Sequence, residues 1–302
     1  LSTPGQAFND GMGFIQFYFG LPFAMVIICL FFIPIYHRLK IYTAYEFLEN
    51  RFDKRVRTLT ASLFLMQRGL AAGITIYAPA IILSVVLNWD LRITALVVGS
   101  LVILYTLVGG TRAVNITQKL QMFIIFSGMF LALYFIITNF PNQISFLDAI
   151  SIAGKAEKLN FLDFSINLKN RYTFWSGITG GLFLSLSYFG TDQSQVQRYL
   201  SGRSIRESQM GLIMNGFLKV PMQFFILFTG VMVFVFYQFE SAPLNFNPKA
   251  ILTVKESKQI EEFSKLEIEN LETQKKIRKL LLHNGSSKQI DALRKKESKQ
   301  RD

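Results

Sequence analysis

The sequence is poor in the residue types from which most catalytic and metal sites are built. Its 302 residues include one cysteine, Cys29, and two histidines, His37 and His283. A single cysteine excludes an internal disulfide and a thiolate metal site within the chain. Hydrolase, zinc-protease and phosphate-loop motifs are absent, and no paired carboxylates lie inside an apolar run. We therefore expect a protein that is not an enzyme.

Acidic residues are also scarce, with 20 of them against 32 basic residues and a net charge of +12. Such a balance occurs in nucleic-acid-binding proteins, but no basic groove or readout motif accompanies it here. Much of the positive charge lies in short loops between apolar runs, as in the cytoplasmic loops of membrane proteins. The sequence therefore indicates a lipid bilayer, and no nucleic acid, as partner.

Apolar residues are abundant, at 51% of the chain, and phenylalanine alone contributes 30. A membrane-spanning helix needs about 20 mostly apolar residues, because water is absent from the bilayer and every backbone group must be satisfied internally. The sequence has six apolar runs, several of which reach that length, at Gly11–Tyr36, Thr60–Leu87, Ile93–Val108, Leu120–Phe140, Trp175–Tyr188 and Gly211–Phe239. We predict an all-α membrane protein with six transmembrane helices in residues 1–239, followed by a charged, partly helical extramembrane segment in residues 240–302.

Loop charge predicts the orientation of these helices. The loop after the second run holds one basic residue, Arg92, whereas the loops after the first, third and fifth runs are basic. They contain Arg38, Lys40, Arg51, Lys54, Arg55 and Arg57, then Arg112 and Lys119, then Arg198, Arg203 and Arg206. The positive-inside rule makes these three loops cytoplasmic. The N-terminus and residues 240–302 are then expected outside.

Two cationic residues lie within the apolar runs. Lys219 lies well inside the sixth run, two residues before Pro221, which is expected to kink the helix. A charge in the bilayer is costly and usually faces a cavity, so we interpret Lys219 as a functional residue. The alternative is a lysine that pairs with a neighbouring helix for packing alone. Arg68 lies nearer the cytoplasmic end of its run, where it either snorkels to the interface or takes part in function.

The fifth run is unusually rich in small and polar residues. Ser176, Gly177, Thr179, Gly180 and Gly181 open it, and further polar residues follow over Ser185–Asp192. Small residues allow close contact between helices. Two interpretations of the polar part remain open. It is either a broken helix that lines a substrate cavity, or an ordinary helix that ends at Gly190 and continues into a cytoplasmic loop.

Four segments resemble the sodium:solute symporter family, and they occur in the family's order. They are Ile41–Phe52 (IYTAYEFLENRF), Gly109–Val114 (GGTRAV), Thr191–Ser201 (TDQSQVQRYLS) and Phe217–Pro221 (FLKVP). The first and third are the specific matches. The resemblance implies an inverted-repeat, LeuT-like transporter bundle, of which this chain is a fragment with core helices two to seven.

The resemblance also implies roles for particular residues. Lys219 lies where sugar-transporting members carry a substrate-facing lysine. Ser185 and Tyr188 would also face the substrate, with Tyr188 as the inner aromatic gate. Tyr18 replaces an acidic ligand of sugar-binding members, which argues against a sugar. A gate or cytoplasmic network would comprise Asp192, Gln193, Gln197 and Arg198.

The resemblance implies Na+ as the coupling ion, with the main sodium site outside this chain and no metal site within it. Many members have Thr-Asp where this chain has Thr117-Gln118, and a neutral amide does not compensate an ion's dehydration. We therefore expect a single coupling sodium. The predicted function is symport of a small polar organic solute, such as a sugar, sugar acid, amino acid or carboxylate, across the cytoplasmic (plasma) membrane. The alternative is a transporter-like sensor, which would need a signalling domain beyond Asp302.

Residues 240–302 differ sharply in composition from the rest of the chain. Apolar residues at near-helical spacing among Glu and Lys favour an amphipathic helix, namely Ile260, Phe263, Leu266, Leu271, Ile277 and Leu281. A turn is predicted at Asn284–Ser287. The other interpretation is a solvated, partly disordered loop.

Overall fold

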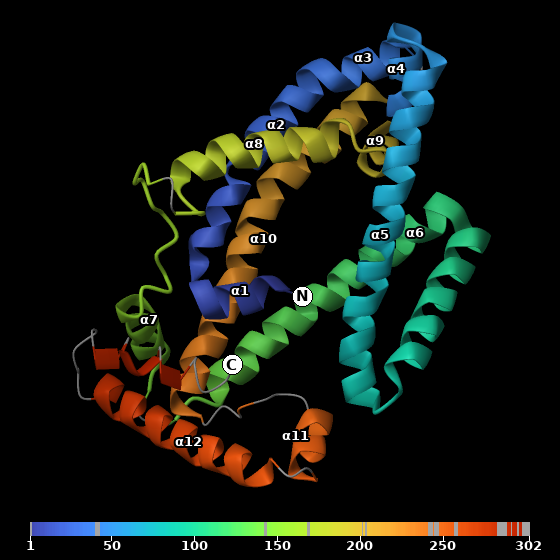
Figure 1. Cartoon of the computed structure of the whole chain (residues 1–302). Coiled ribbons are helices and arrows are strands. Elements are labelled where there is room, and N and C mark those ends of the chain that lie inside the picture. The colour runs from blue at the N-terminus through green and yellow to red at the C-terminus, as the bar shows by residue number, and fades with distance from the viewer. Residues whose placement is uncertain are drawn as a thin grey trace. The chain divides into compact units, whose positions relative to one another are not determined.

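The computed structural model describes residues 2–39, 43–141, 144–167, 170–200, 202, 204–240, 244, 248–256, 259–282, 289–290, 292–294 and 296–297. All regular secondary structure in these ranges is helical (Figure 1). The chain divides into two compact units. One comprises Leu1–Leu70 with Glu157–Val231, and the other comprises Ala71–Ala156 with Met232–Asp302.

The first apolar run is not one uniform α-helix. After the short helix α1 (Ser2–Asp10), the helix type changes three times along the run. The successive elements are the 3-10 helix η1 (Met12–Tyr18), α2 (Gly20–Ile27), the π-helix η2 (Ile28–Phe32) and α3 (Ile33–Leu39). Gly11 separates α1 from η1 with φ +81°, and a Cβ there would lie 2.8 Å from the Lys158 carbonyl oxygen. Only glycine fits this conformation and this close approach without strain.

Helix α8 (Phe174–Gly190) packs closely against η1 and α2, beside which it lies in Figure 1. Glycines permit this approach. A Cβ on Gly177 would lie 2.2 Å from the Gln16 carbonyl oxygen, and one on Gly20 would lie 2.3 Å from the Leu182 nitrogen. The small residues at the start of the fifth run therefore form a close helix–helix contact, as predicted.

The remaining helices of this unit bring the candidate site residues together. They are α4 (Ala44–Arg51), the first part of α5 (Lys54–Leu87), α9 (Gln193–Leu200) and the first part of α10 (Ile205–Phe239). Thr43 caps α4, since its hydroxyl accepts the Glu46 N–H at 3.2 Å. A buried cluster connects the first run with α8, α9 and α10, and its members include Met25, Ile28, Ile33, Phe189, Val196 and Leu212.

The second unit contains the rest of α5 and α10 with four further helices. These are α6 (Leu91–Thr138), α7 (Phe146–Lys155), α11 (Pro248–Lys255) and α12 (Ile260–Leu282). Helix α6 contains two predicted spans. At Gly110 the backbone turns to φ +53° and ψ −152°, which is not helical, so the chain bends sharply between the spans.

Five helical segments are long and apolar enough to cross a membrane among the described residues. They are Met12–Leu39, Lys54–Leu87, Leu91–Gly110, Val114–Thr138 and Ile205–Phe239. Many large apolar side chains on them are exposed, for example Leu70 at 75% and Val108 at 89%. The fifth predicted run forms α8, which has only 17 residues and is about 25 Å long. It is shorter than the roughly 30 Å hydrocarbon core because the chain turns at Thr191.

The charged segment after Phe239 is mostly helical where it is described. The predicted amphipathic helix is present as α12, with 23 residues. Arg278 on α12 donates to the Phe239 carbonyl oxygen at 2.9 Å and so caps the end of α10. The predicted turn at Asn284–Ser287 lies outside the described residues. The division at residue 239 stays a prediction.

Candidate functional site

Helix α8 is intact through its polar last turns. The Thr191 N–H bonds to the Ser187 carbonyl oxygen at 3.2 Å, and the Thr191 hydroxyl donates to the same oxygen at 2.8 Å. Within Ser185–Asp192 the helix is therefore unbroken as far as Gly190, and it is interrupted only at Thr191 and Asp192, before α9. The ordinary helix ends at Gly190, as its alternative predicted. The next residues form no simple loop, however, since α9 begins at Gln193.

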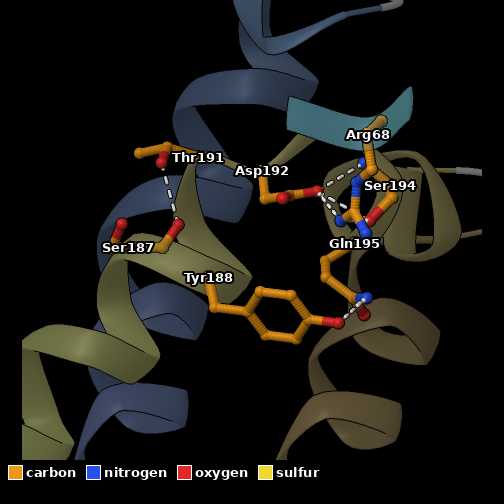
Figure 2. A network of polar contacts seen from close by, with 7 residues as sticks. All are labelled: Arg68, Ser187, Tyr188, Thr191, Asp192, Ser194 and Gln195. Carbon is orange, nitrogen blue, oxygen red and sulfur yellow. Dashed lines mark hydrogen bonds and ion pairs between the residues drawn. The ribbon is translucent and has the colours of Figure 1, made fainter. Parts of the chain in front are cut away.

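The turn between α8 and α9 holds a network of charged and polar side chains (Figure 2). Arg68 reaches it from α5 and places Nη2 2.6 Å from Asp192 Oδ1. Ser194 donates to the same carboxylate oxygen through its hydroxyl at 2.6 Å and its N–H at 2.9 Å. Arg68 also contacts the Ser194 hydroxyl. The interpretation that Arg68 takes part in a specific contact, rather than only snorkelling, is therefore favoured.

Asp192 is held in its charged form. Burial works against ionisation, but hydrogen bonds from Ser194 and the Arg68 guanidinium outweigh it and hold the pKa of Asp192 below its usual value. The side chains of Arg68 and Asp192 are only 34% and 14% exposed. The ion pair is therefore partly shielded from solvent, where it is stronger than a surface pair.

Tyr188 lies beside this network and has its own partner. Gln195 Nε2 donates to the Tyr188 hydroxyl at 2.8 Å, which links the end of α8 to α9 (Figure 2). The Tyr188 ring lines two separate cavities.

Two buried hydrogen bonds fix the turn to the first part of the chain. The Tyr36 hydroxyl donates to the Gly190 carbonyl oxygen at 2.9 Å, and Gln193 Oε1 accepts the Ala44 N–H at 2.8 Å. Gln193 therefore holds α4, whereas Gln197 is exposed on α9. Sequence reasoning did not single out Tyr36, Ser194 or Gln195 for this network. Ser194 and Gln195 lie within the family-like segment, which was the available signal.

The first cavity has a volume of about 510 Å³ and is largely aromatic. Polar groups from α5 and the end of α8 also line it, including Gln67, Ser187 and Asp192. The second cavity, of about 490 Å³, lies among α8, α9 and α10 and is more polar. Its lining includes Tyr188, Phe189, Gln195, Arg198, Glu207, Ser208, Asn215 and Lys219.

Lys219 lines the second cavity near the middle of α10, a helix of 35 residues that continues through Pro221. Its Nζ lies 5.6 Å from the centroid of the Phe189 ring and 5.9 Å from that of Tyr18. These are cation–π distances. The structure thus brings Tyr18 and Lys219 together, although they are far apart in sequence. Ser185 lines neither of the two cavities, whereas Ser187 lines the first.

Metal-binding side chains do not gather in the described ranges. No group of three or more His, Cys, Asp or Glu residues there is placed to hold a metal ion. Thr117, in the segment considered for a second sodium ion, lies on α6 and donates to the Val114 carbonyl oxygen at 2.9 Å.

These features define a class of protein. Membrane-length helices, polar cavities and a cavity-facing ammonium within a membrane helix are typical of proteins that move solutes across bilayers.

Comparison with known proteins agrees with this class. A model of the sodium:solute symporter family matches residues 1–263. The human sodium/iodide cotransporter is 32% identical over 244 residues, which is 78% of this chain and 36% of that protein. The human sodium-coupled monocarboxylate transporter 1 is 36% identical over 215 residues, 71% of this chain and 35% of that protein. This chain belongs to the sodium:solute symporter family, and it spans about a third of the length of these curated relatives.

The fold agrees with a solved structure. A Na+-coupled sialic acid symporter, in its substrate-bound outward-open state, superposes with a TM-score of 0.70 at 28% sequence identity. The match covers 84% of this chain and 53% of that protein. The prediction of a LeuT-like transporter bundle is confirmed, as is that of a multi-pass membrane protein.

Proposed function

We propose that the intact protein is a sodium-coupled symporter that moves a small polar organic solute across the plasma membrane by alternating access. Family membership supports this proposal, and the observation that carries it is Lys219. Its ammonium lies near the middle of a membrane-length helix, faces a cavity and contacts two aromatic rings. A charge in that position is costly unless it serves a ligand or a pathway.

The relatives do not identify the solute of this protein, because they are named for different solutes. They are named for iodide, monocarboxylates, vitamins and sialic acid. In the proposed mechanism, Lys219 and Tyr18 contact the solute, and Tyr188 acts as the inner gate. Ser185 is retained as a predicted substrate contact, although the present conformation places it outside both cavities.

The Arg68–Asp192 network would control the cytoplasmic side. It joins α5 to the turn after α8, so it must break or move if these elements separate to release the solute. Gln193 holds α4 to the same turn, and Arg198 lines the second cavity near Gln195. Gln197 is the member of the predicted network with the least structural support, since its side chain is exposed.

Uptake by the intact protein in proteoliposomes tests the function. An inward sodium gradient should drive accumulation of at least one member of a panel of sugars, sugar acids, amino acids and carboxylates. Potassium in place of sodium, or an ionophore that collapses the gradient, should abolish it. Sodium and solute fluxes measured together should give one sodium per solute, and two would contradict the single-ion proposal.

Lys219→Ala should lower this uptake at least tenfold, a loss of about 1.4 kcal/mol or more, while the protein still inserts into the membrane. Lys265→Ala is the matched control, because Lys265 is exposed on α12. Unchanged uptake by Lys219→Ala, with normal amounts of reconstituted protein, would remove the proposed role of this lysine.

A further inference from the structure

Helix α12 is covered on one face and bare on the other. The covered face holds the buried residues of the helix, Asn270, Thr273, Gln274 and Ile277. The opposite face holds exposed residues spaced alternately four and three positions apart, Glu261, Lys265, Ile268, Glu272, Lys275 and Lys279. Residues at this spacing form one continuous stripe along a helix, as in coiled coils. We call this row the outer stripe.

The middle of the outer stripe is an uncovered apolar side chain. Ile268 is 60% exposed, Ile260 about two turns away is 42% exposed, and both line a shallow groove along the helix. Helix α12 belongs to the segment predicted to lie outside the membrane, where such side chains face water instead of lipid. Burial of apolar surface is favourable, and an exposed apolar groove with a charged rim is typical of a protein-binding surface.

Charge is separated along α12. Residues 261–272 carry five glutamates and one lysine, whereas residues 275–279 carry four basic residues and no acidic one. The helix dipole favours acid in the first turn and base in the last, but its effect falls off beyond these turns. Glu272 and Lys275 lie in the interior of the helix, so the dipole does not account for the separation. A helix of this kind repels a parallel copy of itself and attracts an antiparallel copy.

The outer stripe also matches a reversed copy of itself in register. Glu261 lies seven residues before Ile268 and Lys275 lies seven residues after it, about 10.5 Å along the axis in each direction. A second α12 turned end to end about Ile268 therefore sets each Glu261 opposite a Lys275. Among the residues that the structure describes, neither Glu261 nor Lys275 has an ion-pair partner. Both charges are thus available to a second copy.

We propose that the outer stripe of α12 is the contact of a homodimer, in which two copies of this chain pack antiparallel. The two-fold axis passes through Ile268, which meets Ile268 of the second copy, and an ion pair between Glu261 and Lys275 closes each end. Both copies keep one orientation in the membrane, so the axis runs along the bilayer normal and α12 lies along the membrane surface. Lys265 and Glu272 lie at the edges of the contact and stay in water. The contact contains none of the residues proposed for transport, so it goes beyond that function.

A single cysteine tests the self-contact. In the otherwise cysteine-free intact protein in lipid membranes, Ile268→Cys should form a disulfide-linked dimer under a mild oxidant, because a residue on the two-fold axis meets its own copy. Glu267→Cys is the matched control, since Glu267 is exposed on the same helix but lies about 100° round from Ile268. It should stay monomeric on a non-reducing gel. Equal cross-linking of the two variants, or none of Ile268→Cys, would overturn the proposal.

Exchange of charges tests the antiparallel register. Glu261→Lys and Lys275→Glu should each raise the dimer dissociation constant at least tenfold, about 1.4 kcal/mol or more, because like charges then meet at both ends. The double variant exchanges the two charges and should restore the dimer. Light scattering of the purified intact protein over a range of concentrations measures the dissociation constant. Glu267→Lys, off the stripe, should leave it unchanged. A double variant as monomeric as the single variants would contradict the register and with it the proposal.

Uptake separates this proposal from the transport function. Ile268→Asp should give monomers, because it places two carboxylates together on the axis, and sodium-driven uptake per copy should continue. Parent protein that transports but is monomeric at every concentration would overturn the dimer alone. A dimer that cross-links through Ile268→Cys without sodium-driven uptake by the parent would retain the contact and remove the transport function.

Discussion

At the scale of single residues, the Arg68–Asp192 pair is the contact whose chemistry is best defined. Two charges 2.6 Å apart and mostly shielded from solvent attract each other strongly, and Ser194 adds two hydrogen bonds to the same carboxylate. The pair joins elements more than 100 residues apart in the chain. Loss of the pair should therefore lower both the stability of the protein and its transport activity.

Arg68→Gln and Asp192→Asn should each lower the free energy of unfolding by about 1–3 kcal/mol, because each leaves a shielded charge unpaired. The double variant should lose less than the sum, since the pair is coupled. Thermal unfolding and uptake of the four proteins provide the measurement. Additive losses would show that the two side chains do not interact.

The same pair should respond to pH in a defined direction. The pKa of Asp192 is lowered in the folded protein, so its contribution is complete above the usual aspartate pKa and is lost as pH falls through the folded value. The difference in stability between the parent and Asp192→Asn should therefore be constant near neutral pH and vanish in acid. Unfolding midpoints across a pH series test this, and a difference that grows in acid would contradict it.

At the scale of helices, the contact of α8 with the first run depends on glycines that leave no room for a side chain. Gly177 touches the backbone of η1, whereas a Cβ on Gly180 of the same helix would meet nothing within 4 Å. Gly177 and Gly180 are close in sequence but meet different surroundings, which makes them a matched pair for substitution.

Gly177→Ala should destabilise the protein by about 1–3 kcal/mol, the usual cost of overpacking, because a Cβ would lie 2.2 Å from the Gln16 carbonyl oxygen. Gly180→Ala should instead leave stability unchanged or raise it by up to about 1 kcal/mol, through the higher helix propensity of alanine. Unfolding midpoints in detergent measure both. Equal effects of the two substitutions would show that α8 does not pack on η1 in this way.

At the scale of the whole molecule, the charge of the loops predicts the orientation of the protein in the membrane. This orientation fixes the side of the membrane on which each helix begins and ends. The basic loop around Arg55 is predicted to be cytoplasmic and α12 external. Labelling of single introduced cysteines can test this orientation, because the chain has only one natural cysteine and it is buried. In intact cells that carry an otherwise cysteine-free protein, a membrane-impermeant maleimide should label Lys265→Cys. It should label Arg55→Cys only after the membrane is opened, and the reverse pattern would invert the topology.

Much of the architecture was predictable because it depends on local patterns. Length and hydropathy identified five of the spanning segments, and the segments around Tyr45, Asp192 and Lys219 carried the family resemblance. The run that forms α8 gives the shortest of the predicted spans, at 17 residues, and apolar composition does not show where the chain turns. A departure from regular α-helix was one of two interpretations for the polar end of α8. In the described residues such departures also occur in the apolar first run, at η1 and η2, which its composition did not predict.

The sequence by itself determined that this is a helical, multi-pass membrane protein of the sodium:solute symporter family with a cation inside its last span. Those properties depend on composition and spacing along the chain. Only the tertiary structure decided that Arg68 pairs with Asp192, that Tyr18 lies beside Lys219, and that Gln223 is buried without an acceptor for its Nε2. Each of these depends on which distant segments meet in space, and helix packing sets that, because the side chains of one helix fit only certain partners.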